Sequence, residues 1–313
     1  MWKALLVCLM MCFMLIAPLN AEDQSVEPAD NSWWENNLIV ATGYGVPPEG
    51  VANTAKARRL ANKAAMSDAY RLLAEQAGAV RITANETVTV KEVSAVIKGA
   101  KIISEEYDEY DICTVVMSVP VYGVKDSIAQ AVLRRVEKED FPTVEPDQTV
   151  EVEGNYTGLV IDCGDLELNP VMLPAILNDS DQSIYAYNNL DYEKVIANGM
   201  IGYVEIGADE EPITVEPTVE EPTAVEPTTD QPTVEEPTIG ARTKVLSADA
   251  RGDMSRAGDN PLVVKVAGLN ADGSCPIVST ADANKILSEN QASQFLNNGS
   301  VVFMSNRIRG ARY

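Results

Sequence analysis

The stretch that decides the fold reads Leu38-Ile39-Val40-Ala41-Thr42-Gly43-Tyr44-Gly45-Val46-Pro47-Pro48 and continues into an alanine-rich run, residues 51–77. It predicts a strand, a proline turn and then a long helix. Apolar residues recur in the run at spacings of three and four, which indicates one buried helix face. They are Ala57, Ala61, Ala65, Ala69 and Leu72. Arg58 and Asp68 interrupt that face, and Gly78 is expected to end the helix.

The segments after the helix predict a small antiparallel sheet. Residues 80–90 alternate weakly between apolar and polar types, and residues 93–99 fit a helix or a strand. Residues 100–107 and 110–121 predict two strands joined by a two-residue turn, and residues 126–136 predict a closing helix. We therefore expect an α+β domain over residues 33–137, with the long helix packed on a small antiparallel sheet.

Two short features of this domain have both a structural and a functional interpretation. Trp33-Trp34 is expected to cap the core, with binding of a partner or a glycan as the alternative. Gly43 and Gly45 precede a helix, as glycines of a phosphate-binding turn do, but Pro48 stands where a dinucleotide fingerprint has its third glycine. We therefore expect the two glycines to permit a bend of the strand against the helix.

The amino terminus has the layout of a secretory signal peptide. Lys3 precedes an apolar run, residues 4–16, which is shorter than the about 20 residues that a membrane-spanning helix needs. The small residues Ala17 and Ala21 suit the positions before a cleavage site, which is expected after Ala21. Residues 1–21 are therefore predicted to be a signal peptide. The mature chain is predicted to be exported, periplasmic or associated with the outer envelope, and without an integral membrane span.

The composition excludes several classes of function. The chain has 313 residues and a formal net charge of -23, which argues against nucleic acid or an anionic membrane surface as a partner. It contains no histidine, so a Ser-His-Asp triad, a Cys-His pair and a histidine-ligated metal are excluded. We predict no catalytic residues, no cofactor and no metal site.

Three cysteines lie outside the predicted signal peptide, so at most one disulfide can form within the mature chain. Cys113 shares a strand face with apolar residues and is expected to be a buried thiol. Cys163 and Cys275 are able to pair if their strand and turn meet, and the sequence leaves this alternative open.

The second half of the chain predicts another domain. Residues 138–154 are acidic and contain two prolines, which predicts a linker. Strands and helices alternate over residues 155–313, which predicts an α/β domain. An insert at residues 209–240 interrupts this domain with repeats of Val-Glu-Pro-Thr or Val-Glu-Glu-Pro-Thr.

The insert has a composition that opposes a packed core. Residues 205–240 contain eleven acidic residues and no lysine or arginine. Regular proline and like charges predict a disordered, extended segment. One interpretation of the insert is a spacer or a partner-binding arm. We favour a second one, a tolerated surface insertion, because loop closure costs only about 0.6 kcal/mol per doubling of length.

Several segments resemble a known exported family. Residues 41–48, the Ala/Arg-rich helix through Glu75, and residues 99–105 and 119–123 are similar to the LPP-twenty family of small surface lipoproteins, whose domain also occurs in flagellar assembly protein T. The resemblance covers residues 38–137, and parts of the second domain are similar to the C-terminal region of family members. It implies a non-enzymatic bacterial envelope protein with a structural part near the flagellar base or outer membrane. The sequence departs from the family in having no lipidation cysteine and in carrying the repeat insert.

Three acidic residues are candidates for a ligand site: Asp162, Asp165 and Glu167. Neighbouring carboxylates suit acid–base chemistry or Ca²⁺. However, Ca²⁺ needs about 6–8 oxygen ligands, and no dense acidic loop supplies them, so solvated loop acids are the interpretation we favour.

Our main hypothesis is an exported non-catalytic cell-envelope protein with a structural or assembly role and protein partners in the envelope. The alternative is a periplasmic binding module for a small ligand or cation through acidic loop 162–167. A carboxylate-based hydrolase using Asp162 and Asp165 is the least favoured hypothesis.

Overall fold

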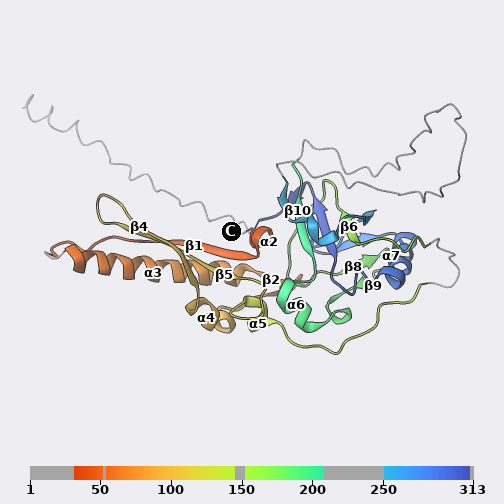
Figure 1. Ribbon diagram of the computed structural model, residues 1–313, viewed down its shortest axis with the longest axis horizontal. Coiled ribbons are helices and arrows are strands. Elements are labelled where there is room, and N and C mark those ends of the chain that lie inside the picture. The colour runs from red at the N-terminus through yellow and green to blue at the C-terminus, as the bar shows by residue number, and fades with distance from the viewer. Residues whose placement is uncertain (1–31, 52–53, 145–151, 208–249, 311–313) are drawn as a thin grey trace, which may run out of the picture. The chain divides into compact units, whose positions relative to one another are not determined.

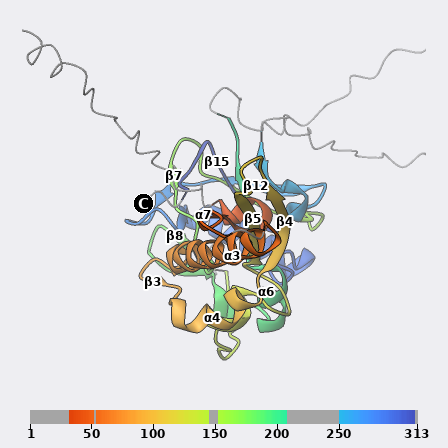
Figure 2. The same ribbon diagram turned by 90° about the vertical axis from the view of Figure 1, so that its left-hand side faces the viewer.

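The first half of the chain is a helix lying on a three-stranded sheet. The computed structural model describes residues 32–51, 54–144, 152–207 and 250–310. Helix α2 (Trp33–Asn36) leads into β1 (Leu38–Gly45), which pairs with β5 (Cys113–Pro120), and β5 pairs in turn with β4 (Lys101–Tyr107). Both pairings are antiparallel. Helix α3 (Thr54–Ala79) runs along one face of this sheet (Figures 1 and 2), which confirms the α+β fold class.

Helix α3 packs through its smallest residues. Its buried side chains are spaced four residues apart: Ala57, Ala61, Ala65, Ala69, Leu73 and Ala77. Leu72, which was predicted on this face, is partly buried and packs against the core, while the spacing of four brings Leu73 fully inward. A Cβ atom at Gly45 would lie 1.9 Å from the carbonyl oxygen of Ala61, and one at Gly43 would lie 2.1 Å from that of Ala65. The strand backbone therefore rests directly on the helix backbone.

Several boundaries differ from the prediction. Gly78 lies inside the last turn of α3, which ends at Ala79. Strands β2 (Arg81–Thr83) and β3 (Glu86–Thr87) are followed by α4 (Val90–Lys98), which settles the ambiguous segment as a helix. The expected two-residue turn is a longer loop, because the Asp108 carboxylate accepts hydrogen bonds from the amides of Tyr110 and Ile112, both at 2.9 Å. The closing helix α5 (Ile128–Val132) is shorter than expected.

The second half is built on a mostly parallel sheet. Strands β10 (Gly202–Glu205), β15 (Val301–Ser305), β6 (Gly158–Asp162) and β12 (Pro261–Lys265) are parallel neighbours, and β11 (Arg251–Gly252) adds an antiparallel edge beside β10. All residues of β6 and β15 are buried, as expected for strands that are covered on both faces.

Smaller elements complete this half. A second sheet has the order β13 (Gly268–Leu269), β14 (Pro276–Val278), β8 (Ile176–Asn178) and β9 (Ser183–Tyr185), and β7 (Glu167–Leu168) pairs with β16 (Arg307–Ile308). The helical elements are η1 (Tyr187–Asn189), α6 (Tyr192–Asn198), η2 (Met254–Ala257) and α7 (Thr280–Ser293). The N-cap of α7 is Ser279, whose side chain accepts from the Asp282 amide.

The two predicted domains share one hydrophobic core. Trp33 and Leu73 from the first domain belong to the same buried cluster as Leu159 and Phe303 from the second. Residues Asn31–Tyr313 accordingly form one compact unit. Backbone bonds also join the halves, with the Met172 amide donating to Arg81 at 2.9 Å and the Leu173 amide donating to Ile82 at 2.8 Å.

Three predicted features lie wholly or partly outside the described residues. The signal peptide and the repeat insert fall in residues 1–31 and 208–249, and part of the linker falls in residues 145–151. The described part of the linker contacts the second domain, where the Glu289 carboxylate accepts from the amides of Glu153 and Gly154, both at 2.8 Å. Among the described helices, none combines the length and apolar composition that crossing a membrane requires.

Candidate functional site

The three predicted ligand residues are each engaged by a different partner. Asp162 is buried at the end of β6 and accepts from the Gly164 amide at 2.9 Å. Asp165 accepts from the Asn306 side chain at 2.8 Å, and Glu167 accepts from Arg309 Nε at 2.7 Å. The bonds of Asp165 and Glu167 join the loop after β6 to the segment around β16. The acidic loop therefore has a structural explanation.

The described residues contain no group of three or more His, Cys, Asp or Glu side chains that could hold a metal ion. Asp162, Asp165 and Glu167 thus do not come together as one cation site. A carboxylate pair for hydrolysis gains no support either, because Asp162 is occupied by the turn of its own loop and Asp165 by Asn306.

All three described cysteines are free thiols. Cys113 is fully buried, as predicted, and Asn62 donates to its sulfur. Cys163 and Cys275 do not form the disulfide that the sequence left open. Burial raises the pKa of the Cys163 thiol to about 12, and the nearby Asp162 adds to the shift. Cys163 is therefore an inert core thiol.

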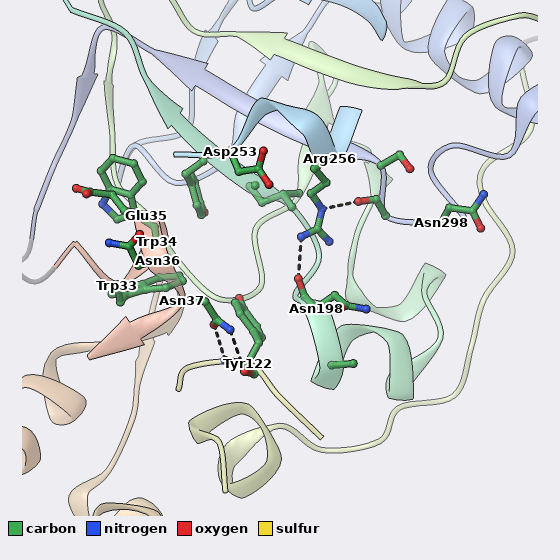
Figure 3. Close-up of a pocket in the computed structure, with 16 residues that line it drawn as sticks. Trp33, Trp34, Glu35, Asn36, Asn37, Tyr122, Asn198, Asp253, Arg256 and Asn298 are labelled. Carbon is green, nitrogen blue, oxygen red and sulfur yellow. Dashed lines mark hydrogen bonds between the residues drawn. The ribbon is translucent and has the colours of Figure 1, made fainter. Parts of the chain in front are cut away.

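A cavity of about 550 Å³ is a second candidate site, which the sequence analysis did not predict. Residues distant in the sequence line it: α2, Tyr122 after β5, the end of α6, Asp253 and Arg256 of the η2 region, and the loop before β15. Figure 3 shows these side chains around the opening. Its volume lies within the about 300–1,000 Å³ typical of small-ligand sites.

The two tryptophans form an aromatic wall of this cavity. Trp33 is buried and meets Tyr122 and Tyr203 edge to face, with ring centroids 6.2 and 6.3 Å apart. Trp34 is also buried, and the Arg251 guanidinium lies 5.5 Å from its ring centre. The expectation that the tryptophan pair caps the core is therefore confirmed. The indole N–H of Trp34 is buried without an acceptor in the described part of the chain.

Arg256 stands across the cavity from the tryptophans (Figure 3), and three carbonyl oxygens hold its guanidinium. Its Nε donates to Gly299, Nη1 to Asn198 and Nη2 to Gly199, each at 2.7 Å. Burial lowers the pKa of Arg256, although nearby tyrosines and Asp253 oppose the shift. An arginine side chain keeps its charge in proteins, so the cavity has a fixed cation in its wall.

Gly199 and Asn37 fix the backbone around the cavity. Gly199 has a φ of +71°, and a Cβ there would lie 2.8 Å from the Tyr122 ring. Only glycine therefore suits the end of α6. Asn37 holds the chain at Tyr122 on both sides, donating to its carbonyl at 2.9 Å and accepting from its amide at 2.7 Å.

A separate surface covers the strands of the first sheet. We use the term apolar strand surface for the exposed side chains of Leu38, Val40, Tyr44, Ile102 and Ile103 on β1 and β4. Leu38, Val40 and Tyr44 face away from α3, whereas Ile102 pairs with the buried Met117 and lies at the β4 edge on the α3 side. Both strands are outer strands of the sheet, and neither pairs with a further strand in the described ranges. Ile103 is 57% exposed, so a large aliphatic side chain lies in solvent on an edge strand. Folded proteins generally avoid that arrangement.

Comparison with known proteins finds similarity in the second half of the chain. The sequence model of one family, described as Treponema pallidum Tp0624, second domain, matches residues 158–234 and 231–307. The first match contains β6 and β10 and the second contains β12 and β15, so both contribute strands to one sheet. No curated protein sequence matches the chain. The resemblance of residues 38–137 to the LPP-twenty family stays a prediction.

Proposed function

We propose that this protein is an exported, non-catalytic cell-envelope protein with a structural or assembly role. The observation that carries the proposal is the apolar strand surface on the first sheet. Large apolar side chains on both outer strands favour a function in which another protein covers them. The resemblance of this domain to envelope lipoproteins and to a flagellar assembly protein supports the same role.

The free edge of β4 suggests how a partner is held. In the described residues β4 pairs with β5 on one side only, so its other side leaves backbone amides and carbonyls available to an added strand. A partner strand that pairs there also covers Ile102 and Ile103. Backbone bonds then hold the partner strand in place, and the two isoleucines give specificity.

The absence of histidine supports a non-catalytic role, because the common nucleophile–base pairs are excluded. The candidate acids point the same way, since Asp162, Asp165 and Glu167 each stabilise one loop. The binding-module alternative through loop 162–167 therefore gains no support from their arrangement.

Export is tested by expressing the full chain with a C-terminal tag and measuring the intact mass of the tagged protein from the envelope and periplasmic fractions. We expect a mature chain that begins at Glu22. A full-length protein found only in the cytoplasmic fraction would overturn the export part of the proposal.

Assembly is tested by placing a photo-crosslinking amino acid at position 103 or 40, with position 67 as the control. Ser67 is also exposed but lies on the solvent side of α3. We expect one discrete adduct from positions 103 and 40, its loss on I102K, and no adduct from position 67. Equal labelling at all three positions, or no adduct at 103 and 40, contradicts a partner at this surface.

A further inference from the structure

The cavity beside Trp34 has an excess of hydrogen-bond donors. Arg256 gives only three of its five N–H groups to carbonyls. It forms no ion pair with a carboxylate in the described part of the chain. Arg256 is partly exposed and Asp253 is the nearby acid that acts on its charge, so two of its N–H groups remain for a ligand.

The indole of Trp34 adds a second donor without a partner. Trp34 is 8% exposed, and its Nε1 has no acceptor among the residues described. Most buried polar groups in native proteins are hydrogen-bonded, and each exception needs an explanation. An acceptor atom of a bound ligand would satisfy this N–H.

Side-chain amides extend the donor set. Asn298 lines the cavity, and its Oδ1 accepts from Lys194 Nζ at 3.3 Å. This bond orients the Asn298 amide and leaves its NH₂ group as a donor. The opposing acceptors are the carboxylates of Asp253 and Glu35. One Asp253 oxygen already accepts from the Ser255 amide at 2.8 Å, and Glu35 is paired with Arg251. The wall therefore suits an acceptor-rich ligand group.

We propose that this cavity binds a ligand that carries a carboxylate next to an apolar group. The carboxylate would accept from Arg256, since a guanidinium makes charge-assisted bonds to carboxylates. Another acceptor atom of the ligand would accept from the Trp34 indole on the opposite wall (Figure 3). The apolar group would pack against the rings of Trp33, Tyr122 and Tyr203. The chemistry fits a small free acid and the C-terminal end of a peptide equally. The inference is independent of the apolar strand surface, which lies on other strands.

The tryptophans provide a direct readout. The chain contains three tryptophans, Trp2, Trp33 and Trp34, so a protein of residues 22–313 keeps only the two in the cavity wall. That protein retains the whole compact unit Asn31–Tyr313. Its tryptophan fluorescence, excited selectively over that of tyrosine, therefore reports on this site alone.

The first probes are N-acetyl-L-leucine and its amide, which differ only in the carboxylate. We expect saturable quenching or a shift of emission by the acid, with at least tenfold weaker binding of the amide, which corresponds to about 1.4 kcal/mol. A tripeptide Ala-Ala-Leu with a free or an amidated end distinguishes the two sources. Binding of the free-ended peptide identifies a chain end as the ligand, and binding of the small acid only identifies a free acid.

Variants test the two donors. W34F removes the indole N–H and keeps an aromatic ring, and Trp33 remains as the reporter. We expect threefold to tenfold weaker binding of N-acetyl-L-leucine, while Y110F in the exposed β4–β5 loop leaves the affinity unchanged. R256K is expected to weaken selectivity for the acid over the amide, because lysine keeps the positive charge but loses the forked donor geometry. Since Arg256 also ties three backbone carbonyls, W34F keeps the test valid if R256K does not fold.

The proposal is overturned by equal affinity for acid and amide, by unchanged affinity in folded W34F, or by no fluorescence response to either the acid or the free-ended peptide. Because this test uses cavity residues and the crosslinking test uses β1 and β4, one proposal can fail while the other stands.

Discussion

Replacing Gly45 by alanine tests the direct contact between β1 and α3. The added Cβ would lie 1.9 Å from the Ala61 carbonyl oxygen and 2.6 Å from the Ala65 amide nitrogen, where ordinary contacts begin at 3.4 Å. Helix and strand must therefore separate by roughly 1.5 Å at this point. Both opposing atoms belong to the helix backbone, so no side-chain rotation relieves the clash.

The separation weakens the packing of the whole alanine stripe on the sheet. A gap of about 0.5–1 Å already removes a quarter to a half of the dispersion attraction, and overpacking typically costs about 1–3 kcal/mol. The alanine also restricts the unfolded chain, which offsets about 0.4–1 kcal/mol. We expect a net loss of about 2 kcal/mol, or a melting temperature lower by about 4–8 °C for a unit of this size.

The assay is urea and thermal unfolding followed by far-ultraviolet circular dichroism, with G268A as the matched control. A Cβ at Gly268 meets no atom within 4 Å, so this variant should equal or slightly exceed the native stability. Equal unfolding midpoints for G45A and G268A would refute the backbone contact between β1 and α3.

Three further predictions follow from side-chain environments. Partial burial alone would raise the pKa of Asp272, but hydrogen bonds from Arg81 and Ser274 lower it overall. The Arg81–Asp272 pair should therefore make its full contribution to the free energy of unfolding above pH about 4. This contribution should be lost as the pH falls through the lowered pKa of Asp272, and in D272N the urea midpoint should depend less on pH in this acidic range. Iodoacetamide at pH 8 should alkylate the partly exposed Cys275 and spare the buried Cys113 and Cys163. Peptide mass spectrometry checks this, and a peptide joining Cys163 to Cys275 contradicts it. Millimolar Ca²⁺ should leave the melting temperature unchanged, because the described residues contain no group of acids that could hold the ion. Binding would be visible, since an ion at 100 times its dissociation constant adds about 2.7 kcal/mol to the free energy of unfolding.

The sequence predicted those elements whose pattern is local. The spacing of Ala57, Ala61, Ala65 and Ala69 indicated both α3 and its buried face, because helical periodicity needs no knowledge of the partner surface. The close packing of Gly43 and Gly45 on that face was expected only as a bend. The distance between two backbones depends on both elements together and cannot be predicted from the sequence of either element alone.

The cavity could not be predicted from the sequence. Trp33, Tyr122 and Arg256 are brought together by a core that spans both predicted domains. No short sequence motif indicates that these three residues lie near one another. Trp33-Trp34 was the one signal, and it correctly indicated a core cap. The acidic loop illustrates the opposite case, since Asp162, Asp165 and Glu167 are close in the sequence but each has its own partner.

Strands β10 and β11 place the described residues on either side of the segment 208–249 next to each other. Val204 lies opposite Gly252, and Glu205 lies opposite Arg251, in one antiparallel pair. Arg251 Nη1 also bonds Glu205 at 2.9 Å. Glu205 and Arg251 are therefore neighbours, and the distance between them is set by strand pairing. Gain or loss of Val-Glu-Pro-Thr units by slippage during DNA replication would leave that distance unchanged. This junction is consequently the place where related genes can vary in length, and where a fluorescent domain can be inserted.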